Sequence, residues 1–304
     1  MRVIITGGTG LIGSALAKRL LQKGDEVILL SRNPQAKRSD SPAGVKLEAW
    51  DGRSADGWGK LVNVDTAIVN LAGENLSAGL WTEARKKRII DSRVNAGLAV
   101  SQAVEQAESK PAVVIQSSAV GYYGVQDQSL ISEGHKPGVD FLSQVCLAWE
   151  SSTLKVEQLV VRRAIIRTGV VLSKDEGALS KMLLPFYFFV GGPIGNGKQG
   201  FSWIHLQDEA AAIEFLIHHP QAEGVFNLSA PQPVSNRQFA QTIGKVLKRP
   251  AIIPVPGFVL KLVLGEMSTV ILDGQYVQPK RLLEHGFEFS FTDAESALRD
   301  LLEK

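Results

Sequence analysis

Glycines recur at short spacing near the start of the chain. Gly8, Gly10 and Gly13 follow a short apolar run and precede a helical pattern, which is the context that the G-x-G-x-x-G fingerprint requires. Glycines let the backbone approach a pyrophosphate, and the N-terminus of the helix offers N–H groups and partial positive charge. The pattern predicts a dinucleotide site at Gly7, Gly8, Thr9, Gly10, Leu11, Ile12 and Gly13. The alternative is a glycine turn that binds nothing.

A second group of residues bears on which dinucleotide is bound. NAD-preferring sites carry Asp or Glu about 20 residues beyond the third glycine, where the carboxylate holds the ribose 2′-OH. Here that place holds Ser31 and Arg32, and Lys37 and Arg38 follow. A hydroxyl and a guanidinium suit a 2′-phosphate, whereas a carboxylate would repel it. We therefore predict NADP(H) rather than NAD(H), with a solvated basic turn as the alternative.

Composition excludes several classes of protein. The chain has 304 residues, of which 44% are hydrophobic and 21% are charged, and its formal net charge is +2. This balance is that of a soluble globular protein and gives no basic field for nucleic acid. A single cysteine, Cys146, makes neither an intrachain disulfide nor a thiolate zinc site. We expect no metal, no signal peptide, no membrane insertion and a cytoplasmic location, and the pattern leaves the oligomeric state open.

Apolar runs and helical patterns alternate along the first two-thirds of the chain. The expected strands are Val3–Thr6, Glu26–Leu30, Val45–Trp50, Thr66–Asn70, Val113–Ser117 and Gln158–Ala164, with helices at Leu11–Lys23, Thr82–Gln106 and Phe141–Leu154. This alternation predicts an α/β fold, a Rossmann-type doubly wound parallel sheet. We expect residues 1–172 to form this domain, joined by 203–229. Residues 173–202 and 230–304 then form a smaller, mainly helical C-terminal lobe, in which Ser235 caps a helix.

Four further segments carry a resemblance to a known family. They are Asn70–Gly73, Ser117–Gly124, Arg167–Leu172 and Gly195–Asp208, and a tail through Pro279–Leu283 extends the likeness. With the glycine loop, they resemble the extended short-chain dehydrogenase/reductases, which include sugar epimerases. Within that superfamily the chain is most similar to the group called epimerase family proteins, some of them described as cell-division-inhibitor-like. The resemblance covers essentially the whole chain and implies an NADP-binding domain with a lobe closing over the nicotinamide end.

The resemblance also implies further cofactor-binding positions. Asp51 would lie near the adenine, while Leu71, Ala72 and Gly73 would line the ribose and pyrophosphate. Ser117 would lie at the cofactor, and Arg167 belongs to the segment that passes the nicotinamide. Asp51 can equally be part of a turn, and Arg167 can equally belong to a structural ion pair.

The chain departs from the family where the chemistry resides. For proton transfer the superfamily uses Tyr-x-x-x-Lys with an upstream Ser or Thr. The positive charge of the lysine lowers the pKa of the tyrosine hydroxyl. Here Leu142 and Cys146, or in the neighbouring register Phe141 and Val145, take those places. Ser118 remains the candidate for the upstream hydroxyl. The candidate proton donors are Tyr122, Tyr123 and His205, each of which has a packing or structural alternative.

A second departure concerns the substrate. Sugar-nucleotide enzymes of this family often carry Arg where this chain has Phe201, and a phenyl ring does not bind a diphosphate. Phe201, Trp203 and Phe186–Phe189 suggest an apolar pocket, with packing in the core as the commoner alternative for such aromatics. We therefore expect an NADP(H)-dependent oxidoreductase acting on a small, non-nucleotide carbonyl or hydroxyl substrate. The alternatives are a catalytically weak NADP(H)-binding regulatory protein and, less favoured, a sugar epimerase.

Overall fold

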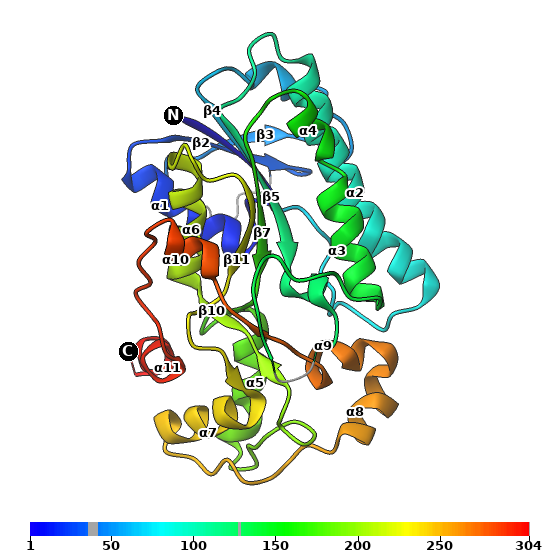
Figure 1. Ribbon diagram of the computed structural model, residues 1–304, viewed down its shortest axis with the longest axis vertical. Helices are drawn as coiled ribbons and strands as arrows, with labels where there is room; N and C mark the ends of the chain where they lie inside the picture. The colour runs from blue at the N-terminus through cyan, green and yellow to red at the C-terminus, as the bar shows by residue number, and fades with distance from the viewer. Residues whose placement is uncertain (36–41, 127–128, 304) are drawn as a thin grey trace.

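A parallel sheet forms the centre of the molecule (Figure 1). The computed structural model describes residues 1–35, 42–126 and 129–303, and within them the main sheet has seven strands. In spatial order these are β11 (Gly224–Leu228), β7 (Arg163–Thr168), β5 (Val113–Ala119), β4 (Thr66–Asn70), β1 (Arg2–Thr6), β2 (Glu26–Ser31) and β3 (Lys46–Ala49). All neighbouring pairs are parallel. The predicted doubly wound α/β fold is confirmed.

Helices cover both faces of this sheet (Figure 1). On one side lie α2 (Glu83–Gln106), α3 (Phe141–Ser151) and α4 (Leu154–Gln158), and on the other α1 (Leu11–Gln22), α6 (Leu206–His218) and α10 (Lys280–Glu284). Successive side chains of a strand point to opposite faces. Accordingly Val3 and Ile5 pack toward α1 and α6, whereas Ile4 packs toward α2. Burial on both faces explains the continuous apolar runs of the central strands.

The predicted boundaries of one strand were wrong. Gln158–Ala164 reads as a strand, but Gln158 ends α4, the chain turns at Val160 with φ 58°, and β7 begins at Arg163. The two arginines of β7 hid its apolar pattern. Arg163 is nonetheless buried, because Glu157 pairs with its guanidinium at 2.7 Å.

The C-terminal lobe has a core of its own below the sheet (Figure 1). Side chains from α5 (Gly177–Tyr187), α7 (Asn236–Leu247) and α11 (Ala294–Leu302) form it. Short strand pairs join the lobe: β8 (Val170–Leu172) with β10 (Trp203–His205), and β9 (Gly200–Phe201) with β12 (Val234–Ser235). The remaining short elements are η1 (Gly59–Leu61), η2 (Val120–Tyr123), β6 (Leu130–Ile131), α8 (Gly257–Leu264), η3 (Gly265–Ser268), α9 (Thr269–Leu272) and β13 (Tyr276–Val277).

The structure tests two expectations about the lobe, the Ser235 helix cap and the environment of its aromatic side chains. Ser235 caps α7 as predicted, and with Gln238 it forms a capping box. For Trp203 and Phe186 the core alternative is confirmed in place of the apolar pocket. Trp203 and Phe186 are buried in the core of the lobe, whereas Phe188 and Phe189 are exposed on its surface. In the described residues, no helix has the length and apolar character needed to cross a membrane.

A buried carboxyl group connects β7 to α6. The Thr168 hydroxyl, at the end of β7, donates to Glu209 Oε1 at 2.9 Å. Glu209 lies in the first turn of α6 and is fully buried. Burial raises the pKa of Glu209 from its usual 4.5 to about 8, although the bond from Thr168 opposes the shift. The folded protein therefore holds this proton at neutral pH.

This carboxyl group predicts a loss of stability with rising pH. Because the folded pKa lies above the unfolded value, the folded state binds more protons between pH 4.5 and about 8, so the free energy of unfolding falls across that window. We expect Glu209→Gln to remove a slope of up to about 1.4 kcal/mol per pH unit. Urea unfolding of both proteins across the window measures it. Parallel curves for the two proteins would contradict a neutral buried Glu209.

Candidate functional site

Three glycines make the loop after β1 close-packed. A Cβ on Gly7 would lie 2.8 Å from the Leu71 carbonyl carbon, and one on Gly13 would lie 2.5 Å from Gly8 Cα. Gly8 faces Leu29, whose Cδ2 would be 2.6 Å away. Gly7 also has φ +66°, a conformation that favours glycine. These contacts hold the loop against β4, β2 and the start of α1.

Gly10 differs from the other three glycines. It is the N-terminal cap of α1, no side chain caps the helix there, and the first turn holds no acidic residue. A Cβ on Gly10 would meet no atom closer than the Gly7 oxygen at 3.4 Å. The open side of the loop thus lies at a helix N-terminus, next to the half-exposed Thr9, Leu11 and Ile12. This arrangement is suited to bind a phosphate group through backbone N–H donors.

The end of β2 lies beside this loop. Thr6 pairs with Leu30 in the sheet, so Ser31 and Arg32 follow at the edge where the glycine loop begins. The Ser31 hydroxyl accepts from the Asn33 amide at 3.2 Å, and Arg32 is exposed. Lys37 and Arg38 lie outside the described residues. Ser31 and Arg32 therefore lie where they could contact a charged group of a ligand bound next to the loop.

Asp51 is engaged in its own turn. Its Oδ1 accepts from the Arg53 and Ser54 amides at 2.7 and 2.9 Å, and its Oδ2 accepts from the Ser54 hydroxyl. The Ser54 and Arg53 amides lower the pKa of Asp51. These bonds are what the turn alternative predicts. A contact between Asp51 and adenine stays a prediction.

Buried polar side chains connect the ends of the three central strands. The Thr6 hydroxyl donates to Asn70 Oδ1 at 2.6 Å, and Asn70 Nδ2 donates to Gln116 Oε1 at 2.9 Å. The Ala72 amide donates to the Thr6 hydroxyl, and the Leu71 amide donates to the Thr6 carbonyl. Leu71, Ala72 and Gly73 are thereby fixed against the glycine loop, at the carboxyl edge where open α/β sheets bind ligands.

Sequence reasoning missed Arg93, a buried cation at this edge. Its Cζ lies 3.0 Å from where a Cβ on Gly73 would be, and its guanidinium lies over the Trp149 ring at 4.9 Å. Nη1 donates to the Glu74 and Ile89 carbonyls. Burial lowers the pKa of Arg93 to about 10, so it stays charged at neutral pH. The only signal in the sequence was its helical spacing of four from the buried Ile89.

The end of β5 carries the two predicted serines. Ser118 is 2% exposed, and its hydroxyl donates to Glu150 Oε1 at 2.6 Å. Ser117, on the alternate face of the strand, is 7% exposed, and its backbone carbonyl accepts from Gln116 Nε2 at 2.7 Å. The Ser118 hydroxyl is therefore directed into the protein interior. Its catalytic role stays a prediction that this geometry does not favour.

Glu150 and Arg167 form a buried ion pair beneath the two serines. Arg167 Nε and Nη2 donate to the two Glu150 oxygens at 2.9 and 3.0 Å. Burial alone would lower the pKa of Arg167, but the hydrogen bonds and charge of Glu150 raise it overall. The structure thus gives Arg167 the ion-pair role that was its alternative in the sequence.

The neighbouring tyrosines differ in their environments. Tyr123 is fully buried. Its hydroxyl donates to Asn227 Oδ1 at 2.6 Å and accepts from Arg167 Nη1, and burial raises its pKa to about 12. Tyr122 is half-buried, and its ring lies 3.3 Å from the Arg167 guanidinium carbon. In the described residues, no protein group hydrogen-bonds to the Tyr122 hydroxyl. Of the two tyrosines, Tyr122 therefore stays the predicted proton donor.

His205 occupies a structural position. Its Nδ1 accepts from the Gln207 amide at 3.1 Å and so caps α6, and its ring stacks on Phe291 at 3.9 Å. Its Nε2 lies 3.5 Å from Asp300 on α11, and the side chain is buried. These contacts connect α6 to the C-terminal helix. A proton-donor role for His205 stays a prediction without support from this geometry.

The two possible registers of the missing Tyr-x-x-x-Lys pair both lie on α3, and in one of them Phe141 and Val145 pack in an apolar cluster with Trp81. Leu142 and Cys146 face η2 from α3, where a Cβ on Gly121 would be 3.3 Å from Leu142 Cβ and 4.0 Å from Cys146 Sγ. Cys146 is buried, its thiol is 3.7 Å from the Ala119 carbonyl, and burial raises its pKa to about 11. Neither side chain supplies a proton or a cation at neutral pH.

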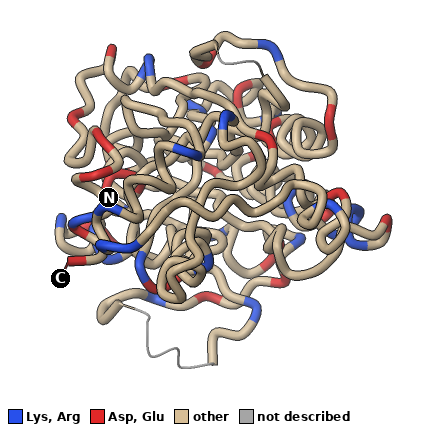
Figure 2. Tube along the Cα trace, turned by 90° about the horizontal axis from the view of Figure 1, so that it is seen from below, with Lys and Arg blue, Asp and Glu red and all other residues tan. Residues whose placement is uncertain are grey.

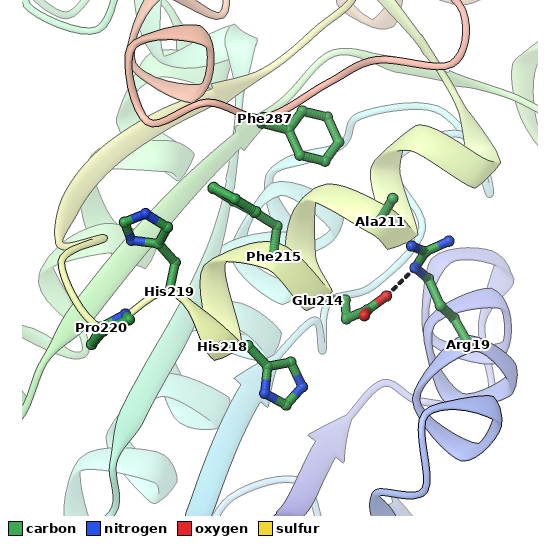
Figure 3. Close-up of a pocket in the computed structure, with 8 residues that line it drawn as sticks. All are labelled: Arg19, Ala211, Glu214, Phe215, His218, His219, Pro220 and Phe287. Carbon is green, nitrogen blue, oxygen red and sulfur yellow. Dashed lines mark hydrogen bonds and ion pairs between the residues drawn. The ribbon is translucent and has the colours of Figure 1, made fainter.

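Two further observations delimit the site. Among the described residues, no three His, Cys, Asp or Glu side chains gather as metal ligands do. A surface pocket of about 340 Å³ lies between α1 and α6 and includes Arg19, Glu214, Phe215 and His219 (Figure 3). It lies at the helix ends away from the glycine loop. The Arg19–Glu214 ion pair forms part of its wall, and we assign it no role.

Comparison with known proteins gives the family. The NAD dependent epimerase/dehydratase family matches residues 3–139, and a domain of unknown function, DUF1731, matches residues 255–301. The epimerase family protein SDR39U1 homolog of Arabidopsis thaliana is 40% identical and covers 100% of this chain and 87% of its own length. The epimerase family protein YfhF of Bacillus subtilis is 38% identical and covers 99% and 98%.

A solved structure gives the same result. The human epimerase family protein SDR39U1, crystallised with NADPH, is 35% identical with a TM-score of 0.89, and each chain is covered in full. Full-length likeness at this identity, together with the glycine loop at the carboxyl edge of a doubly wound sheet, leaves one assignment. The chain belongs to the epimerase/dehydratase family of extended short-chain dehydrogenase/reductases, in the group named epimerase family proteins.

Proposed function

We propose that this protein binds NADP(H) and is an oxidoreductase acting on a small, non-nucleotide carbonyl or hydroxyl substrate. The observation that carries the proposal is the loop itself: three glycines are packed against backbone or side chains, and Gly10 leaves an open side at the N-terminus of α1. The human relative crystallised with NADPH supports the choice of ligand.

The residues present fit an NADP(H) molecule along the carboxyl edge. The first turn of α1 would hold the pyrophosphate through Leu11, Ile12 and Gly13 amides. Ser31 and Arg32 would bind the 2′-phosphate, which a guanidinium contacts bidentately. Leu71, Ala72 and Gly73 would line the ribose and pyrophosphate beside Arg93, a permanent positive charge where the family's lysine is missing.

The proton chemistry falls to Tyr122 in this proposal. When bound, the cofactor supplies or accepts a hydride. Tyr122 would exchange a proton with the substrate oxygen through its phenolic hydroxyl, and the ring is held in place by Arg167. Ser118, Tyr123 and His205 support the site structurally, because their polar groups already have protein partners.

The substrate class follows from Phe201. Its half-buried ring packs against Phe239 with centroids 4.3 Å apart, at the edge of the core of the lobe. It offers no charge to a diphosphate, so a sugar nucleotide is disfavoured.

A regulatory function is the second candidate. The observation that favours it is that three of the four predicted catalytic side chains have their polar groups engaged inside the protein. Calorimetric titration with NADPH and with NADH, followed by a panel of carbonyl compounds, separates the two. Tight NADPH binding with turnover supports the oxidoreductase. Tight binding without turnover on any compound supports the regulatory protein, and absent binding overturns both.

The glycine loop gives a prediction about NADPH affinity. Gly10→Ala introduces a methyl group with no neighbour closer than 3.4 Å at an ordinary φ of −86°, so the fold is retained. The methyl group would obstruct the pyrophosphate, and NADPH affinity is expected to fall about tenfold or more. Gly13→Ala is the contrasting variant, which is expected to damage the fold and not the open side of the loop alone. Its Cβ meets backbone at 2.5 Å and costs about 1–3 kcal/mol of stability. Unchanged NADPH affinity in a folded Gly10→Ala protein would place the pyrophosphate elsewhere.

Arg32 gives a prediction about cofactor choice. Arg32→Ala removes a charge-assisted contact, worth on the order of 1.5–3 kcal/mol, that only the 2′-phosphate makes. We expect NADPH affinity to fall roughly 10- to 100-fold while NADH affinity changes little. Arg299→Ala, a change of an exposed arginine on α11, is the control and leaves both unchanged. An equal loss for both cofactors would rule out the 2′-phosphate contact.

The two adjacent tyrosines provide a matched pair. Tyr122→Phe keeps the ring on Arg167 but removes the hydroxyl, so turnover is expected to fall about 10²- to 10⁴-fold at unchanged NADPH affinity. Tyr123→Phe loses a buried hydrogen bond, which lowers stability by about 1 kcal/mol, and retains turnover. The measurements are steady-state rates and urea unfolding. Should Tyr123→Phe abolish turnover and Tyr122→Phe spare it, the roles are reversed.

A further inference from the structure

The C-terminal lobe exposes many large apolar side chains on one side. Phe188 is 70% exposed, Ile252 79%, Phe258 73% and Leu262 84%. We call the apolar face the exposed side chains of Tyr187, Phe188, Phe189, Val190, Ile252, Ile253, Phe258, Val259, Leu262 and Val263. Large exposed apolar groups that gather in this way mark an interaction surface rather than scattered surface residues.

The segments of the apolar face run side by side. Gly191 pairs with Ala251, and the Ile253 amide donates to the Gly191 carbonyl at 3.1 Å. The Arg249 guanidinium lies 4.0 Å from the centre of the Phe189 ring. The same extended stretch leads through Pro256 into α8, none of whose residues is buried. Figure 1 draws the end of α5, this stretch and α8 along the lower edge of the molecule.

Positive charge predominates around the apolar face, although Glu266 follows α8 by two residues and Asp273 interacts electrostatically with Lys261. The two stretches that supply this face, residues 177–207 and 224–265, contain no Asp or Glu. They do contain Lys198, Lys248, Arg249 and Lys261, all exposed. Lys245 is also exposed but is paired with Glu295 at 2.6 Å. Figure 2 looks at the molecule from this lower side, with cationic residues in blue.

We propose that the apolar face binds the surface of a bilayer that contains anionic lipids. Aromatic and aliphatic side chains enter the boundary between headgroups and acyl chains, and the lysines and the arginine contact the phosphates. With eight residues, α8 is too short to span a bilayer and lies in its surface. The inference does not depend on the proposed function, because none of these residues belongs to the cofactor site.

Other occupants fit the face less well. A two-fold contact between copies of this chain would bring Lys248, Arg249 and Lys261 of both copies together, and like charges oppose such contact. A nucleic acid would use the cations but leave the phenylalanines and isoleucines in water. A bilayer with anionic headgroups uses both kinds of side chain at once.

Co-sedimentation of the full-length protein with vesicles tests the proposal. One set of vesicles is phosphatidylcholine alone, and the other has equal parts of phosphatidylcholine and phosphatidylglycerol. We expect binding to the second set and little to the first, weakening as salt is raised. Replacing Lys248, Arg249 and Lys261 by Gln should lower the affinity about fivefold for each charge. Phe188→Ser and Phe258→Ser should each lower it about tenfold or more.

Matched controls keep the result unambiguous. Val64→Ser alters an exposed apolar residue that precedes β4, at the amino ends of the strands and away from the C-terminal lobe. This variant should leave vesicle binding unchanged. Urea unfolding shows that every variant is folded, and NADPH titration reports on the cofactor site separately. Absence of wild-type sedimentation with the anionic vesicles overturns the proposal. So does sedimentation that Phe188→Ser and Phe258→Ser leave at the wild-type level. A concentration-dependent dimer abolished by the same variants, without vesicle binding, assigns the face to a second copy.

Discussion

The buried pair between Glu150 and Arg167 determines how the polar groups at the ends of β5 and β7 are arranged. It joins α3 to β7 beneath the end of β5, and its partners include the Ser118 hydroxyl and both tyrosines of η2. Removing either charge would leave the other uncompensated in the interior, which typically costs 3–5 kcal/mol. The pair therefore constrains every neighbouring polar group. Ser118 and Tyr123 are directed inward by it, and Tyr122 is left with its ring against the guanidinium.

This arrangement explains how the family's reactive residues are absent without collapse of the site. Leu142 and Cys146, which hold the pair's positions in one of the two registers, pack against Gly121, so α3 approaches η2 through apolar contact. Positive charge is still present at this edge, because Arg93 lies against Gly73 from α2. The chain thus retains a cation beside the strand end, although it comes from a different helix.

The candidate cofactor site and the apolar face lie in different parts of the fold. The glycine loop, the polar connection from Thr6 to Gln116 and Arg93 all lie at the carboxyl edge of the main sheet. The apolar face belongs to the end of α5, the stretch around Ile252 and α8, which Figure 1 draws along the lower edge of the C-terminal lobe. A protein attached to a surface through that face would keep the cofactor edge away from the point of attachment.

Much of this could be predicted from the sequence because it depends on local rules. The glycine spacing after a strand, the alternation of apolar runs and helices, and the serine cap of α7 each act within a few residues, and each was found in the structure. What the sequence could not give was which polar groups meet across the fold. Ser118 is 32 positions from Glu150, and Tyr123 is 104 positions from Asn227. Arg93 approaches Gly73 only because α2 packs beside β4. Such contacts depend on how helices and strands stack, and only the tertiary structure decided them.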